Sequence, residues 1–123
     1  MWPTKGEVHC RLGAVQFPHV RVCASFMRRL QGLLGRKAME PLSGALLWPA
    51  GSIHTFAMKF AIDVLYLDKS GAVVKIAQQV APNRMSFGPW KSFAVLEVAA
   101  GTSTRVQIGD RCVWDTSVWS EQA

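Results

Sequence analysis

Several features that would assign a class at once are missing from this sequence of 123 residues. No apolar run approaches the roughly 20 residues that a membrane-spanning helix needs. The N-terminal segment MWPTKGEVHCRLG has a single lysine and lacks the apolar stretch of a secretory signal. Internal repeats, low-complexity tracts and linkers are also absent. We therefore expect one cytoplasmic domain over residues 1–123, with a core of about 20–113 and ragged ends.

Cysteine is scarce and follows no pairing or metal-binding pattern. Cys10, Cys23 and Cys112 form no C-x-x-C motif, and the nearby His9 and His19 complete no zinc-site spacing. An odd number of unpaired cysteines is typical of a reducing compartment. The sequence thus predicts buried, inert thiols, with neither a metal nor a cofactor.

Acidic residues are few. Eight Asp and Glu face fourteen Lys and Arg, which gives a net charge of +6 and a pI near 9.7. Such a charge favours anionic partners, including non-specific nucleic acid. The densest basic groups lie in residues 28–37 (Arg28-Arg29 and Arg36-Lys37), so a nucleic-acid-associated regulator that uses this segment is one alternative function.

Apolar periodicity predicts a mainly β (α+β) domain, a compact β-barrel or sandwich of about seven short strands. One short helix near the N-terminus is expected over 26–35, with Ser25 as its N-cap and Gly35 at its end. A hairpin turn is expected at 68–71, a long loop at 81–91 and a helical turn at 102–107. The expected strands are 19–24, 44–48, 53–60, 62–68, 72–80, 92–101 and a last one after Gly109-Asp110.

An aspartate interrupts the apolar strand IDVLYL. Asp63 shares a face with Leu65 and Leu67 in a strand, where an unpaired carboxylate costs several kcal/mol. It therefore needs a cationic partner or a set of loop backbone amides to cap, unless it is a pocket carboxylate poised to bind or to move a proton. The candidate partners are Lys59, His54, Arg36 and Arg84.

Glu97 presents the same problem at the centre of VLEV. With Asp63 it would form a carboxylate pair suited to acid–base chemistry, and His54 could act as a base near neutral pH. A solvent-facing Glu97 and a structural His54 explain the sequence equally well. A hydrolase that uses His54, Asp63 and Glu97 is thus a second alternative. Because the chain has no G-x-S-x-G motif and no glycine-rich phosphate loop, we favour a protein that is not an enzyme.

Tryptophan is the other notable residue type. Trp48 and Trp90 lie beside prolines, at strand ends or in loops. Indoles at such positions either stack on sugar rings and bases or fold over the edge of the core.

Five motifs follow one another in a specific order: LQGLLGR (30–36), SGALLW (43–48), HTFAMKFAIDVLYLD (54–68), VLEVAAG (95–101) and IGD (108–110). In this order they resemble the DUF192, or UPF0127, family of small bacterial and archaeal proteins of unknown function. The resemblance runs from about Val20 to Val113. It implies a compact, mainly β domain with a short helix near its start.

From these observations we expect a non-catalytic module that binds a small, carbohydrate-like ligand, with a polar cluster around Asp63. Among the motif positions, Arg36, His54, Lys59 and Asp63 are expected to share that polar patch. The candidate ligand-binding residues are Arg36, His54, Lys59, Asp63, Glu97, Trp48 and Trp90.

Overall fold

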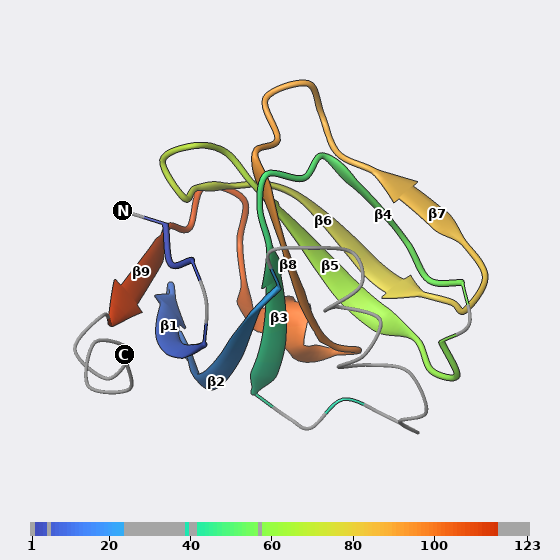
Figure 1. The fold of residues 1–123 in the computed structure, drawn as a ribbon, viewed down its shortest axis with the longest axis horizontal. Helices are drawn as coiled ribbons and strands as arrows, with labels where there is room; N and C mark the ends of the chain where they lie inside the picture. The colour runs from blue at the N-terminus through green and yellow to red at the C-terminus, as the bar shows by residue number, and fades with distance from the viewer. Residues whose placement is uncertain (1, 5, 24–38, 40–41, 57, 116–123) are drawn as a thin grey trace.

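A computed structural model of the chain describes residues 2–4, 6–23, 39, 42–56 and 58–115 (Figure 1). These residues form nine strands and one 3-10 turn. The elements are β1 (Glu7–Leu12), β2 (Val15–Cys23), β3 (Ser43–Leu47), β4 (Ser52–His54), β5 (Ile62–Leu67), β6 (Val73–Val80), β7 (Met85–Phe87), β8 (Ala94–Ala99), η1 (Thr102–Arg105) and β9 (Cys112–Asp115).

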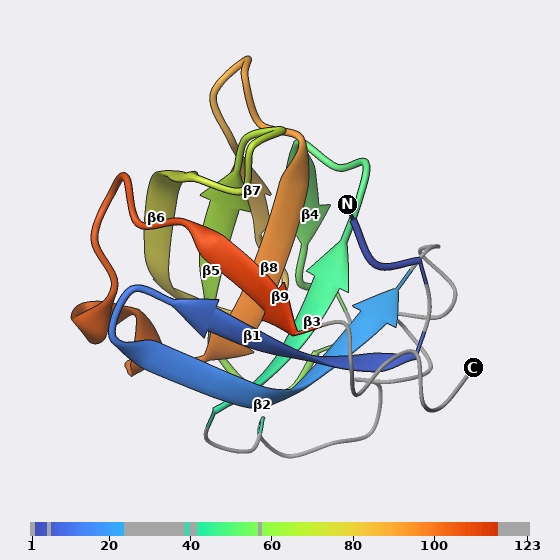
Figure 2. The same ribbon diagram turned by 90° about the vertical axis from the view of Figure 1, so that its left-hand side faces the viewer.

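Seven strands form one curled sheet in the order β6-β5-β8-β3-β2-β1-β9. All neighbours in this sheet are antiparallel except β2 and β3, which run parallel. Figure 2 shows the strands wrapping around a common interior, with β1 and β2 crossing in front of β3 and β8. The mainly β class is confirmed, in the form of a half-barrel.

The two edges of the sheet, β6 and β9, meet at one end only. Ala72 and Arg111 form an isolated antiparallel bridge just before these strands. Around it, the amide of Val73 donates to the Asp110 carbonyl at 2.8 Å, and the amide of Cys112 donates to the Gly71 carbonyl at 2.9 Å. This short seam satisfies edge groups that would otherwise be open to a strand from another chain.

A second sheet of β4 and β7 covers part of the outer face of β5 and β8 (Figure 1). It buries Ile53 against Val64, Tyr66 and Val95. As a result β5 is buried at every position, because its other face lines the interior of the barrel. A strand covered on both sides needs no polar alternation, which explains the apolar run IDVLYL.

Two hydrophobic clusters therefore lie back to back across the sheet. The interior cluster includes Leu65 and Leu67 of β5 and Leu96 and Val98 of β8. The outer cluster contains the alternate residues of the same strands, among them Ile62, Val64, Tyr66 and Val95. Residues one apart on these two strands thus face different environments.

Several sequence predictions need correction. The expected strand 53–60 ends at His54, and β7 lies within 81–91, where a loop was expected. The chain enters the sheet at β1, well before residue 20, because Val8, Leu12 and Phe17 belong to the interior cluster. The helix expected over 26–35 lies outside the described residues. Within the described ranges η1 alone is helical, and it begins after Gly101 without a side-chain cap.

The loop after β7 passes close to the ring of Tyr66, so we predict that Gly88→Ala destabilises the domain by about 1–3 kcal/mol. A Cβ atom at Gly88 would overlap the Tyr66 ring and the Ser92 hydroxyl. Gly51→Ala is the matched control, because no atom lies within 4 Å of the corresponding Cβ position. Urea unfolding of both variants measures the difference, and equal midpoints would contradict the close packing of Gly88 on Tyr66.

Candidate ligand site

Asp63 lies on the interior face of β5 and is completely buried. Its Oδ1 accepts a hydrogen bond from the amide of Gln79 at 2.8 Å, and its Oδ2 accepts from the amides of Gly101 and Ser103 at 2.9 Å each. Of the two structural roles expected for this carboxylate, the capping of loop amides is thus the one observed. These bonds to Asp63 come from backbone amides and replace the water that burial removes.

One of these bonds holds an irregular position in β6. The pairing of β5 with β6 shifts register between Ile62 and Val64, and Gln79 has φ +50°. Left-handed backbone is uncommon for a residue other than glycine. The Asp63 carboxylate therefore fixes the irregularity as well as the turn into η1.

Glu97 points to the opposite face of the sheet. It pairs with Val64 in the ladder, whereas Asp63 pairs with Val98, so the two carboxylates lie on different sides of β5 and β8. Glu97 is buried near Tyr66, whose hydroxyl donates to Ser86 Oγ at 2.6 Å. Burial raises the pKa of Tyr66, the Ser86 hydrogen bond opposes this, and the charge of Glu97 raises it further. The carboxylate pair that the alternative hydrolase would need does not form, because adjacent strand positions alternate between faces.

The other ionisable candidates lie apart from Asp63. His54 ends β4, and its Nδ1 accepts from the Phe56 amide at 3.3 Å. Lys59 and Arg84 are exposed, whereas Asp63 is completely buried. Arg36 and the whole basic segment 28–37 lie outside the described residues. The hydrogen bonds to Asp63 thus come from backbone amides and not from these described side chains.

Trp48 belongs to an aromatic cluster at one end of the barrel. Its ring centroid lies 6.3 Å from that of Trp2 and 6.1 Å from that of Phe93. Trp2 also contacts Phe93 at 5.4 Å and Trp114 at 5.8 Å. Because the Trp48 indole N–H is bonded to the carbonyl of Pro3, this side chain packs over the edge of the core.

Trp90 is the opposite case, since 95% of its surface is exposed. It borders an open groove of about 560 Å³ between the turn after β5 and the loop before β8. Phe93 lies in this groove, supported from beneath by Trp2 and Trp48, and the ammonium of Lys69 is 5.9 Å from the centre of its ring. The residues that line the groove are Asp68, Lys69, Ser70, Trp90, Lys91, Ser92 and Phe93.

Both sides of the groove are held by short hydrogen bonds. The amide of Gly88 donates to Gly51, and the amide of Phe93 donates to Leu67, so both ends of the Trp90 loop are fixed. On the other side, Asp68 Oδ1 accepts from the amides of Ser70 and Ala72. The hydrogen bond from the Ser70 hydroxyl is the main cause that lowers the pKa of Asp68. Backbone hydrogen bonds therefore hold both sides of the groove in place.

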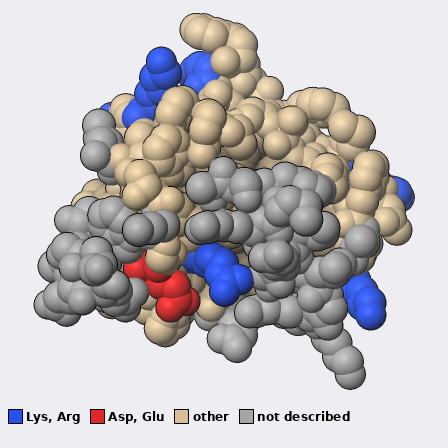
Figure 3. All heavy atoms as spheres, viewed as in Figure 1, with Lys and Arg blue, Asp and Glu red and all other residues tan. Residues whose placement is uncertain are grey.

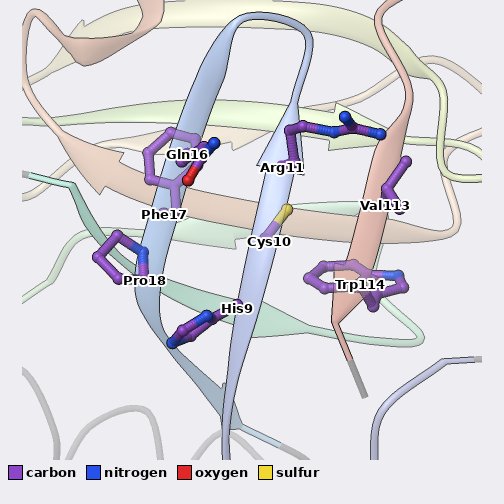
Figure 4. Close-up of a pocket in the computed structure, with 8 residues that line it drawn as sticks. All are labelled: His9, Cys10, Arg11, Gln16, Phe17, Pro18, Val113 and Trp114. Atoms are coloured by element: carbon purple, nitrogen blue, oxygen red, sulfur yellow. The ribbon is translucent and has the colours of Figure 1, made fainter. Parts of the chain in front are cut away.

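A second hollow of about 480 Å³ lies on the outside of β1, β2 and β9 (Figure 4). Arg11 extends from β1 toward Val113, whereas His9 points toward β2. Neither here nor elsewhere in the described chain do three or more His, Cys, Asp or Glu side chains gather as metal ligands.

The three thiols are buried, as the sequence predicted. Cys10 Sγ donates a hydrogen bond to Cys112 Sγ at 3.4 Å. This bond, followed by burial, raises the pKa of Cys112 far above the usual thiol range. A thiol that stays protonated is a poor nucleophile and a poor metal ligand.

Comparison with known proteins supports the family suggested by the motifs. Residues 8–114 match the model of the DUF192 family, which is described as "Uncharacterized ACR". The chain belongs to the DUF192 family. No curated protein is significantly similar in sequence.

Two solved structures share the fold of this DUF192 domain. A protein of unknown function from Novosphingobium aromaticivorans DSM 12444 has 18% identity and a TM-score of 0.76, covering 87% of this chain and 85% of that chain. A "putative transcription regulator" from Sinorhizobium meliloti 1021 has 22% identity and a TM-score of 0.76, covering 93% of this chain and 98% of that chain. At these identities the similarity concerns the fold alone.

Among the residues that line the groove of this DUF192 domain, the sequence named Trp90 as a candidate but not Lys69, Lys91 or Phe93. The two loops meet because β5 and β8 are antiparallel neighbours, so Leu67 lies opposite Ala94. The sequence shows Lys69 and Lys91 next to turn residues. Only the strand order shows that their two loops lie side by side. Within the described residues, no helix is long and apolar enough to span a membrane.

Removing the buried carboxylate leaves three amides without their acceptor, so we predict that Asp63→Ala costs more than about 2 kcal/mol of unfolding free energy. Asp68→Ala is the control, because that carboxylate also caps amides but lies near solvent, where water replaces it. Guanidinium unfolding compares the two variants. A midpoint of Asp63→Ala close to that of the wild type would refute the role assigned to these bonds.

Buried thiols react slowly, so we predict that the native domain resists a disulfide reagent such as DTNB. In guanidinium all three cysteines should be modified at once. Cys23→Ser keeps the Cys10–Cys112 pair, so in guanidinium this control variant should show two reactive thiols instead of three. Rapid reaction of two thiols under native conditions would show that this pair is accessible after all.

Proposed function

We propose that this domain is a non-catalytic module that binds a small anionic ligand, such as an acidic saccharide, in the groove beside Trp90. The observation that supports this most is the 95% exposure of a tryptophan side chain at the tip of a loop whose two ends are fixed. An indole held in this way offers a large, rigid apolar surface on which a sugar ring can stack.

The chemistry of the groove selects the ligand class. The indole of Trp90 offers a flat apolar surface for the C–H face of a sugar ring. The exposed ammonium groups of Lys69 and Lys91 supply positive charge for a carboxylate, sulfate or phosphate substituent. Ser70 lies beside them and adds a hydroxyl group.

Binding is favoured over catalysis because the ionisable groups in the groove already have structural roles or are simple cations. Asp68 holds the turn, and its lowered pKa keeps it ionised. His54, Asp63 and Glu97 line no part of this groove. We propose the reducing cytoplasm as the compartment, which suits three buried thiols.

The test is calorimetric titration with oligogalacturonides and with neutral galacto-oligosaccharides of equal length. We expect the acidic series to bind more tightly, and Trp90→Ala to weaken binding about tenfold, which corresponds to about 1.4 kcal/mol. Trp90→Phe should retain most of the affinity because an aromatic face remains.

Ile108→Ala is the matched control, since Ile108 is 61% exposed but lies outside the groove. Failure of both saccharide series to bind, or equal binding by the Trp90→Ala and Ile108→Ala variants, would contradict the proposed function.

A further inference from the structure

The outer face of the small β4–β7 sheet presents a second set of large apolar side chains. His54 pairs with Met85, and Ser52 pairs with Phe87, so these four side chains share one face. The opposite face directs Ile53 and Ser86 into the protein. Met85 and Phe87 are each 58% exposed, although both are apolar.

An aromatic residue extends this face beyond the end of β4. Phe56 is 48% exposed, and its ring stacks on that of His54 with centroids 4.7 Å apart and planes 28° apart. The backbone beside Phe56 is rigid, because buried Thr55 exchanges hydrogen bonds with Arg84 and its hydroxyl donates to Ala81. We name the surface of His54, Phe56, Met85 and Phe87 the aromatic face.

Positive charge borders the aromatic face. Lys75 Nζ donates to the carbonyl of Phe87 at 2.6 Å, and Arg84 and Lys59 are exposed beside the turn that contains Thr55 and Phe56. The sequence has no Asp or Glu in residues 41–62 or 69–96, which include β4, β6 and β7. In Figure 3 the right-hand side of the molecule, over β4 and β7, carries Lys and Arg and no visible Asp or Glu.

We propose that the aromatic face binds single-stranded nucleic acid. Unpaired bases stack on exposed aromatic rings without much regard to sequence, while nearby cations neutralise the phosphates. A base pair in a duplex does not expose its faces to such rings. An acidic segment of another protein would use the cations but would leave the stacking surfaces of Phe56 and Phe87 unused. This inference does not rest on the saccharide groove, because Phe56 and Phe87 lie outside its lining.

Fluorescence anisotropy tests the proposal with fluorescein-labelled oligonucleotides of about 12 nucleotides, within the site sizes known for such proteins. The probes are oligo-dT, oligo-rU and a mixed-sequence DNA duplex of the same length. We expect both single strands to bind more tightly than the duplex. A difference between dT and rU then shows whether DNA or RNA is preferred.

Substitutions separate stacking from charge. Phe87→Ala and Phe56→Ala should each weaken single-strand binding about tenfold, whereas Ile108→Ala, at another exposed apolar position, should leave it unchanged. Arg84→Ala should reduce the slope of log K against log salt by about 0.7, since it removes one phosphate contact. Arg105→Ala, at another exposed arginine, should leave that slope unchanged.

Three results would overturn the inference. Equal oligonucleotide binding by the Phe87→Ala and Ile108→Ala variants would mean that binding depends on the net charge of +6 and not on stacking at the aromatic face. Tighter binding of the duplex would exclude base stacking. Binding of an acidic, Phe-containing peptide but not of either oligonucleotide would make the face a protein-docking surface. Trp90→Ala separates this inference from the proposed function, because it should weaken saccharide binding about tenfold and leave oligonucleotide binding intact.

Discussion

One carboxylate determines how three separate segments of this fold fit together. Asp63 accepts amide hydrogen bonds from β6 and from the turn that leads into η1, while its own strand runs through the centre of the sheet. An aliphatic side chain of similar size would leave those three amides without their acceptor, and the amide of Ser103 is buried. The buried carboxylate is tolerated because the amide dipoles are directed at it. Hydrogen bonds of this kind are stronger in a site shielded from water than in solution. The path of η1, which places Val106 in the interior cluster, depends on this arrangement.

The buried carboxylates of β5 and β8 lie on opposite faces of the sheet and have different surroundings. On the interior face, Asp63 accepts hydrogen bonds from backbone amides. On the outer face, Glu97 and Tyr66 lie beneath β4 and β7, whose far side presents Met85 and Phe87 to solvent. Surfaces available to a ligand are therefore built on added layers and loops, while the central strands supply rigidity. This is the usual division between a scaffold and its binding loops.

Periodicity and turn chemistry allowed much of the fold to be predicted. The alternation in β6 and the continuous apolar run of β5 located those strands, and Asp68 with Gly71 located the turn between them. Short strands were harder: β7 has three residues, too few for a pattern, and lies between Pro82 and Pro89. Of the residues that line the proposed groove, only Trp90 was among the predicted ligand-binding residues. Whether Asp63 and Glu97 face each other depends on register, and the partners of Trp90 depend on strand order, neither of which is local in sequence.

The pairing of β1 with β9 has a consequence for how this domain can be combined with others. His9 lies opposite Asp115, so the chain enters and leaves the sheet at neighbouring positions on antiparallel strands. A domain with this arrangement can be inserted into a surface loop of a host protein without stretching that loop, and its ends can be joined by a short linker.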